Sequence, residues 1–173
     1  MKIAAGLAVV LTITGAIFWL TVGAQPSLDE RVKGDEVVDM ASEHPAMSAA
    51  FKKAQATLDS FLEIAKNPAP SYESLALKVR VTEGRASEYF WVSPFRVESN
   101  GLSGILSNEP RLVRKVKAGQ TLQFKRADVV DWMYYDSSRN RMHGNFTACA
   151  LLTQESPEES AKFKMQYGLE CDG

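Results

Sequence analysis

An apolar stripe with helical spacing is the clearest pattern in the chain. Between Pro45 and the "NPAP" segment at 67–70, apolar residues recur three or four positions apart: Met47, Ala50, Phe51, Ala54, Leu58, Phe61, Leu62 and Ala65. This spacing puts them on one face of a helix. Proline is accepted in the first helical turn and ends a helix elsewhere, so the pattern predicts one amphipathic helix from Pro45 to "NPAP".

After this helix the apolar period becomes two. Four apolar residues at odd positions from Leu75 to Val81 alternate with Ala76, Lys78 and Arg80, which is typical of a strand with one buried face. The stretch "ASEYFWVSPFRVE" at 86–98 is apolar on both faces, which favours a central strand, and its Pro94 predicts a bulge or the strand's exit. The Asn-Gly pair at 100–101 favours a tight turn into a returning strand, "GILSN".

Shorter elements follow towards the C-terminus. "TLQFKR" and "VVDWMYY" are predicted strands, and a turn over "SSRN" leads into "MHGNFTACALL" at 142–152, which we expect to be the last strand. "SPEE" at 156–159 is a capping box with a proline in the first helical position, and Gly168 suits the end of the short helix it opens. The pattern therefore predicts an α+β fold, in which an N-terminal amphipathic helix packs on a curved, mainly antiparallel sheet of five or six strands with a short C-terminal helix.

The turn over "SSRN" also fixes a predicted hairpin register. Tyr134 lies opposite His143 and Trp132 lies opposite Asn145, so these four side chains share one face. The opposite face, with Val129, Met133, Tyr135 and Phe146 among its members, has the more core-like composition. We therefore predict the four side chains as an exposed binding surface.

The N-terminus reads as a targeting segment. Lys2 is the one charge in residues 1–24, and the run from Ile3 to Ala24 is uncharged and of bilayer-spanning length. The segment is either a signal peptide cleaved after Ala24 or a retained anchor in the inner membrane, and either exports the rest to the periplasm or beyond. Residues 25–43 are predicted to be an acidic flexible tether, and residues 44–173 a single globular α+β domain.

Export changes the meaning of the two cysteines. Cys149 and Cys171 form an even pair in an oxidising environment, where a disulfide is the default expectation.

Several short blocks together carry a family resemblance. "SEYFWV", "GLSGILSNEP", "VKAGQTLQF", "VVDWMYY" and "GNFTACALL" occur in an order and spacing that resemble the YegJ-like family of bacterial proteins, which contain domain of unknown function 2314. The likeness covers about residues 46–152. It implies an exported or envelope bacterial protein with a small α+β domain, and it supplies no activity, ligand or catalytic residue.

The candidate catalytic groups form no familiar site. His143 and Cys149 on one strand would lie about 20 Å apart, too far for a nucleophile and its base. The histidines and cysteines lack the close ligand pairs of zinc sites, and nucleotide-binding fingerprints are absent, so we expect no metal and no cofactor. Asp128 and Asp131 with His143 leave one enzymatic alternative, a hydrolase acting on an envelope polymer.

A run of basic residues suggests a different role. Residues 111–126 carry six bases and no acid, whereas the whole chain has a net charge of -1. Its first part contributes Arg111, Arg114, Lys115 and Lys117, which attract an anionic partner if they are exposed. Nucleic acid is disfavoured as a partner because the domain is exported, and residues 1–24, if uncleaved, are the expected membrane contact.

The expected function is therefore a non-catalytic binding or interaction module in the cell envelope. Its predicted contact surface is Trp132, Tyr134, His143 and Asn145 together with the basic residues from 111 to 117, and its partner is a protein or an anionic envelope component. An immunity-type inhibitor of an exported toxin is one concrete form of such a module. Hydrolysis by Asp128 or Asp131 with His143 is the alternative.

Overall fold

The computed structural model describes residue 28 and residues 42–171. The predicted targeting segment and nearly all of the predicted tether lie outside the described residues. The helices are α2 (Pro45–Lys66), α3 (Phe146–Leu152) and α4 (Pro157–Tyr167), with a short 3-10 helix η1 (Arg126–Asp128). The strands are β1 (Tyr72–Glu83), β2 (Ala86–Glu98), β3 (Gly101–Leu106), β4 (Thr121–Phe124), β5 (Val129–Asp136) and β6 (Arg141–Gly144).

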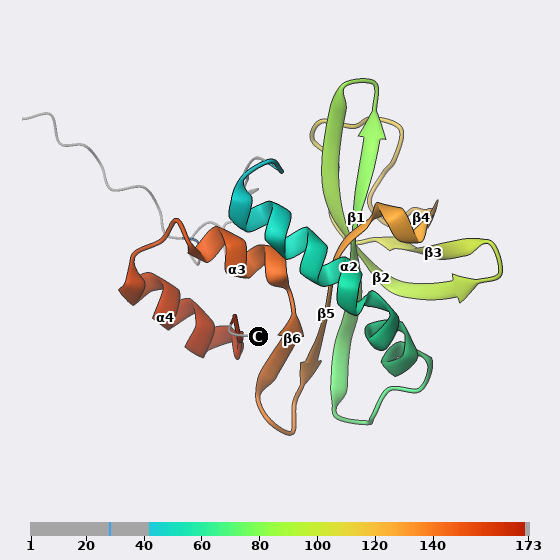
Figure 1. Cartoon of the computed structure of the whole chain (residues 1–173). Coiled ribbons are helices and arrows are strands. Elements are labelled where there is room, and N and C mark those ends of the chain that lie inside the picture. Colours follow the sequence, from blue (N-terminus) through green and yellow to red (C-terminus); the bar gives the residue numbers. More distant parts are fainter. Residues whose placement is uncertain (1–27, 29–41, 172–173) are drawn as a thin grey trace, which may run out of the picture.

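The strands form one antiparallel sheet, which confirms the predicted α+β class. Their order is β4-β3-β2-β1-β5-β6, so the two long strands lie at the centre. The pairing of β2 with β3 shifts register between Val92 and Phe95, around Pro94. Figure 1 shows β2 changing direction along its length, which gives the sheet the predicted curvature.

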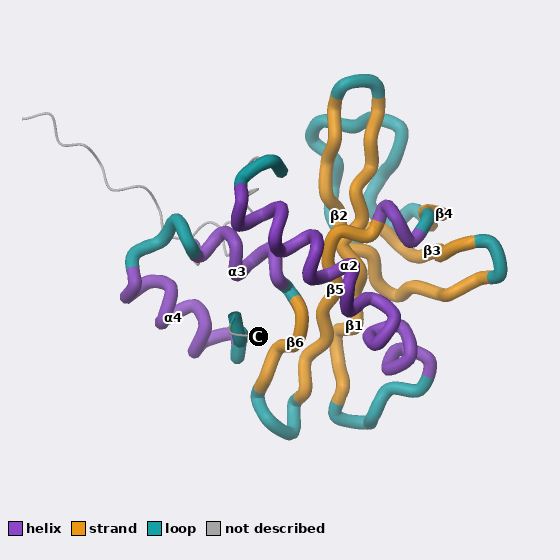
Figure 2. The backbone as a smooth tube through the Cα atoms, viewed as in Figure 1, coloured by secondary structure: helices purple, strands orange, loops and turns teal. Residues whose placement is uncertain are grey.

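The predicted amphipathic helix is confirmed as α2. Its buried residues are Met47, Ala50, Ala54, Leu58, Phe61 and Leu62, all of which belong to the predicted stripe. The side chain of His44 accepts a hydrogen bond from the Ala46 amide, and Asn67 ends the helix. The helix lies across the sheet (Figures 1 and 2), where Leu58 and Phe61 pack with Leu77, Val79 and Phe90 in the largest apolar cluster. Burying each such side chain contributes roughly 1.5–3 kcal/mol.

The predicted last strand is wrong beyond Gly144, because residues 146–152 form the helix α3. Gly144 and Asn145 have φ values of +76° and +52°, which end the strand. A Cβ at position 144 would collide with the Trp132 carbonyl oxygen, so this close approach requires glycine. The Asp131 carboxylate then accepts hydrogen bonds from the Phe146 and Thr147 amides and satisfies the first turn of the helix.

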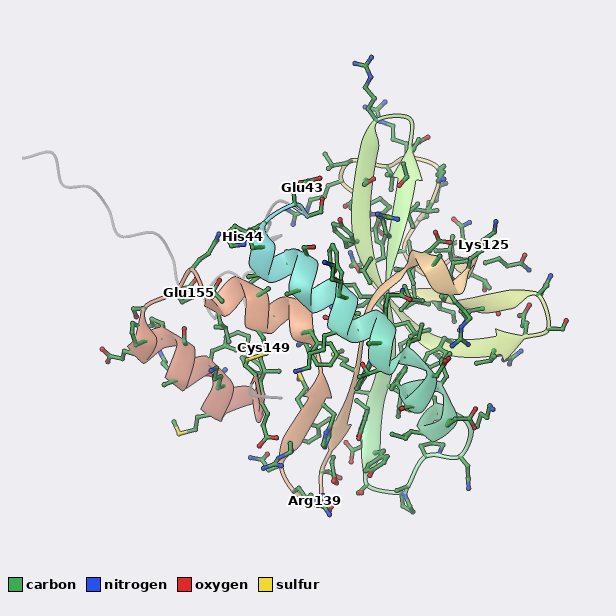
Figure 3. The ribbon with its side chains drawn as sticks, viewed as in Figure 1. Glu43, His44, Lys125, Arg139, Cys149 and Glu155 are labelled. Atoms are coloured by element: carbon green, nitrogen blue, oxygen red, sulfur yellow. A yellow bond between two sulfur atoms is a disulfide. The ribbon has the colours of Figure 1, made fainter. Side chains whose placement is uncertain are left out.

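The C-terminal part is held by α4 and a disulfide. Ser156 accepts a hydrogen bond from the Glu159 amide, which is one half of the predicted capping box, and Gly168 ends α4 with φ +62°, as predicted. Cys149 on α3 and Cys171 form the expected disulfide, with their Cα atoms 5.4 Å apart (Figure 3). Disulfides are compatible with an exported protein. None of the helices in the described part of the chain has both the length and the apolar composition needed to cross a membrane.

Candidate functional site

The β5–β6 hairpin has the predicted register but not the predicted exposure. Tyr134 pairs with His143, yet Tyr134 and Trp132 are only 6% and 8% exposed and belong to the core beneath α2. The Trp132 ring stacks on Phe61 at 4.9 Å, and its Nε1 donates to the Ala54 carbonyl oxygen at 3.2 Å. The prediction that these two rings form an exposed surface is therefore wrong. The alternation of residue types along β5 shows only that the two faces of the hairpin differ. The apolar stripe of α2 decides which face is buried, because α2 packs on that face.

Trp132, Tyr134 and His143 do meet at the wall of a cleft of about 320 Å³ between α2 and β6. The His143 ring stacks on Tyr134 at 4.6 Å. Burial lowers the pKa of His143, with the nearby Arg141 and Arg139 acting in the same direction and Asp136 and Glu170 opposing them. Its surroundings in the cleft therefore favour the neutral imidazole. Asn145 does not line this cleft, and its side-chain amide is turned to the Met142 sulfur at 3.2 Å.

Asp131 has a structural role in the framework of the domain. The side chain is fully buried. Its carboxylate accepts hydrogen bonds from the Trp132, Phe146 and Thr147 amides and from the Thr147 hydroxyl, at 2.7–3.2 Å. The Lys78 ammonium donates to the same hydroxyl at 2.8 Å and lies over the Trp91 ring at 4.9 Å. Burial raises the pKa of Asp131 and lowers the pKa of Lys78, and in each case the other's charge opposes the shift. This group joins β1, β5 and α3.

The residues of the hydrolase alternative do not share a cleft. Asp128 lies in η1, where its carboxylate accepts a hydrogen bond of 2.9 Å from the Lys125 amide. Neither Asp128 nor Asp131 lines the cleft that contains His143. A second cleft, of about 450 Å³, lies among α2, α3 and α4 beside the disulfide and contains none of the three. Among the described residues, no group of three or more histidine, cysteine or acidic side chains is placed to hold a metal ion.

The inner side of the basic loop, residues 107–120 between β3 and β4, is fixed to the domain. Val113 and Val116 are 1% and 5% exposed and belong to the largest core cluster. The buried Glu88 carboxylate on β2 accepts hydrogen bonds from the amides of Arg111, Leu112 and Val113 at 2.8–3.1 Å. This role was missed from the sequence, although an acid directly before the apolar run Tyr89–Val92 of a central strand is a signal for it.

The cationic side chains of the basic loop lie on its outer, exposed side. Arg111, Arg114, Lys115 and Lys117 are all exposed, and Leu112 between them is 63% exposed. At the adjacent tip of the β1–β2 hairpin, the Glu83 carboxylate accepts hydrogen bonds from the amides of Arg114 and Lys115. The Lys115 ammonium donates to the Thr82 carbonyl oxygen at 2.6 Å. The loop is therefore an exposed cationic surface on a fixed backbone.

Comparison with known proteins identifies the family. The model of a family described as "Uncharacterized protein conserved in bacteria (DUF2314)" matches residues 44–171, so the chain belongs to this family, and the resemblance inferred from the short blocks is confirmed. "Uncharacterized protein YegJ" of Escherichia coli (strain K12) is 27% identical over 155 residues, which cover 90% of this chain and 95% of that protein.

A second relative covers less of the chain. A "Putative ankyrin repeat protein" of Neisseria meningitidis serogroup B is 25% identical over 88 residues, or 51% of this chain and 34% of that protein. No solved structure matches. The descriptions of the family and of these relatives name no reaction and no ligand.

Proposed function

We propose that the chain is a non-catalytic binding module of the bacterial cell envelope, and that the basic loop is its contact surface for an anionic partner. The proposal rests on one observation: the inner side of the loop is bound to the domain, whereas its outer side is exposed and cationic. Val113, Val116 and three amides are held by the core and by Glu88, while four cationic side chains are exposed. A fixed backbone means that a partner need not order the loop when it binds.

The local charge favours an anion despite the neighbouring carboxylates. Glu88 and Glu83 are both engaged by backbone amides of the loop. The four cations of the loop and the exposed Arg85 at the hairpin tip outnumber Glu83, Glu88 and Glu109. Such a surface raises the local concentration of an anionic partner and its rate of association, with an effect that salt weakens.

An envelope location is supported by two features. The uncharged run from Ile3 to Ala24 is typical of export, and the Cys149–Cys171 disulfide suits an oxidising compartment. A non-catalytic role is supported by the use of Asp131 as a framework group that caps α3.

The experiment measures the affinity of the full chain, kept in a neutral detergent, for polyphosphate. The loop variant is Arg111→Gln/Arg114→Gln/Lys115→Gln/Lys117→Gln. The control variant, Lys52→Gln/Lys66→Gln/Arg139→Gln/Lys162→Gln, removes four exposed cations elsewhere, so both lose the same charge. We expect the loop variant to lose at least about tenfold in affinity at physiological ionic strength and the control variant to lose much less. Equal losses would contradict the proposal.

A further inference from the structure

The basic loop carries an apolar side chain where a cationic surface does not need one. Leu112 is 63% exposed. Its own amide and those of both neighbours are bound to Glu88, so the backbone at this point is fixed from below. A lone exposed leucine is common on protein surfaces. Its position between Arg111 and Arg114 on an anchored loop distinguishes this one.

We propose that the basic loop binds the surface of an anionic phospholipid bilayer, with Leu112 entering the interface and the flanking cations at the level of the phosphates. This inference rests on the proposed function and names the partner. A bilayer offers anionic headgroups directly above hydrocarbon, so a surface that binds it needs cations around an apolar side chain. The long stems of lysine and arginine allow their charges to stay with the phosphates while the backbone approaches.

Two other anionic partners fit the loop less well. A phosphate-bearing polymer presents charge but has no apolar layer to receive Leu112. Contact centres between proteins are enriched in tryptophan, tyrosine and arginine, whereas leucine is under-represented there. The basic loop, "SNEPRLVRKVKAGQ", contains no aromatic residue. Its combination of leucine and cations is closest to the chemistry of a bilayer interface.

The tip of the β1–β2 hairpin extends the same surface. The hydrogen bonds from Arg114 and Lys115 to Glu83 and Thr82 hold the loop against this tip. Figure 1 shows the loop running beside the end of the hairpin, away from α3 and α4. The exposed Arg85 at the tip therefore adds a fifth cation next to the loop.

The size of the expected effect follows from the number of cations. Each lysine or arginine near an anionic bilayer strengthens binding about fivefold, equivalent to about 1 kcal/mol. A single leucine adds too little to hold the domain on a neutral bilayer. Contact therefore requires anionic lipid, and Leu112 reports whether the loop has entered the interface.

The test places a fluorescent reporter at the proposed point of entry. The full chain carrying Leu112→Trp is reconstituted into vesicles with brominated acyl chains, which quench tryptophan at the interface. The matched control is Met165→Trp on α4, where the native side chain is 78% exposed. The quenching of the parent chain is subtracted from both, so that residues 1–24 and the native tryptophans do not contribute. Vesicles of phosphatidylcholine alone are compared with vesicles that contain phosphatidylglycerol.

We expect the reporter at 112 to be quenched several times more than the reporter at 165 in the anionic vesicles, and equally little in the neutral ones. Adding the four loop substitutions to glutamine should abolish the difference. Equal quenching at the two positions in anionic vesicles would overturn the bilayer inference. If the loop variant still showed its selective loss of polyphosphate affinity, the proposed function would stand with another anionic partner; if that loss were also missing, both would fail.

Discussion

The β5–β6 hairpin and the basic loop show opposite relations between residue type and role. The hairpin region gathers Asp131, Trp132 and His143, residue types that often carry chemistry, yet Asp131 and Trp132 are buried and hydrogen-bonded within the framework. The basic loop looks like an ordinary solvated connection, but its backbone is held by Glu88 and its cations are exposed. In this molecule the partners of a side chain decide its role more than its type does.

The largest expected effect tests whether Asp131 is framework. Asp131→Ala leaves three amides and the Thr147 hydroxyl without their acceptor and the Lys78 ammonium without its counter-charge. We expect the free energy of unfolding to fall by about 3–5 kcal/mol, measured by denaturant titration. Asp128→Ala, which removes one exposed hydrogen bond, is the control and should cost far less. A loss for Asp131→Ala as small as that of the control would refute the framework role.

The next effect concerns the disulfide that closes the C-terminal part. Cys149→Ala/Cys171→Ala opens a loop with a sequence separation of 22 residues. We expect a loss of about 3 kcal/mol in the free energy of unfolding. Reduction of the parent chain should reproduce this loss, and the double variant should not respond to reductant. Polyphosphate affinity should stay unchanged, because the basic loop is remote from α3. A loss of affinity alongside the loss of stability would contradict the proposal that the disulfide and the basic loop act independently.

Glu88 links the framework to the basic loop. Glu88→Gln keeps the shape of the side chain but weakens the acceptor for the amides of Arg111, Leu112 and Val113. We expect a loss of about 1–2 kcal/mol in stability. Hydrogen exchange of the three amides should also become faster, which mass spectrometry can measure. Glu109→Gln removes an exposed acid of the same loop and is the control. Unchanged exchange in Glu88→Gln would show that the carboxylate does not fix the loop.

The smallest expected effect is a pH dependence caused by His143. Burial lowers its folded-state pKa below the usual value of 6.5, so the unfolded chain binds more protons as the pH falls through 6.5. The contribution of His143 to stability is therefore present above pH 6.5 and is lost below it. His143→Gln should flatten the stability profile between about pH 7 and 5. Identical profiles for the variant and the parent chain would show that the ring is not desolvated in the cleft.

The sequence predicted the local elements well and the long-range roles poorly. The stripe from Met47 to Leu62, the register of Tyr134 with His143 and the Cys149–Cys171 pair depend on spacing or on residue type, and the structure confirms them. The predicted strand at 142–152 failed because alternation says nothing of the Asp131 carboxylate on the neighbouring strand β5, which accepts the amides of the first turn of a helix that begins at Phe146. Glu88 was missed for the same reason, since its acceptor role joins positions 23–25 residues apart.

The most direct test of the central claim compares the salt dependence of polyphosphate affinity in three full-length proteins: the parent chain, the loop variant and the matched control variant. If the basic loop is the contact surface, the affinity of the loop variant is low and changes little with salt, whereas the control variant follows the steep dependence of the parent chain. The free energy of unfolding of the loop variant should stay within about 0.5 kcal/mol of the parent value. A loop variant as salt-sensitive and as tightly bound as the control variant would contradict the claim.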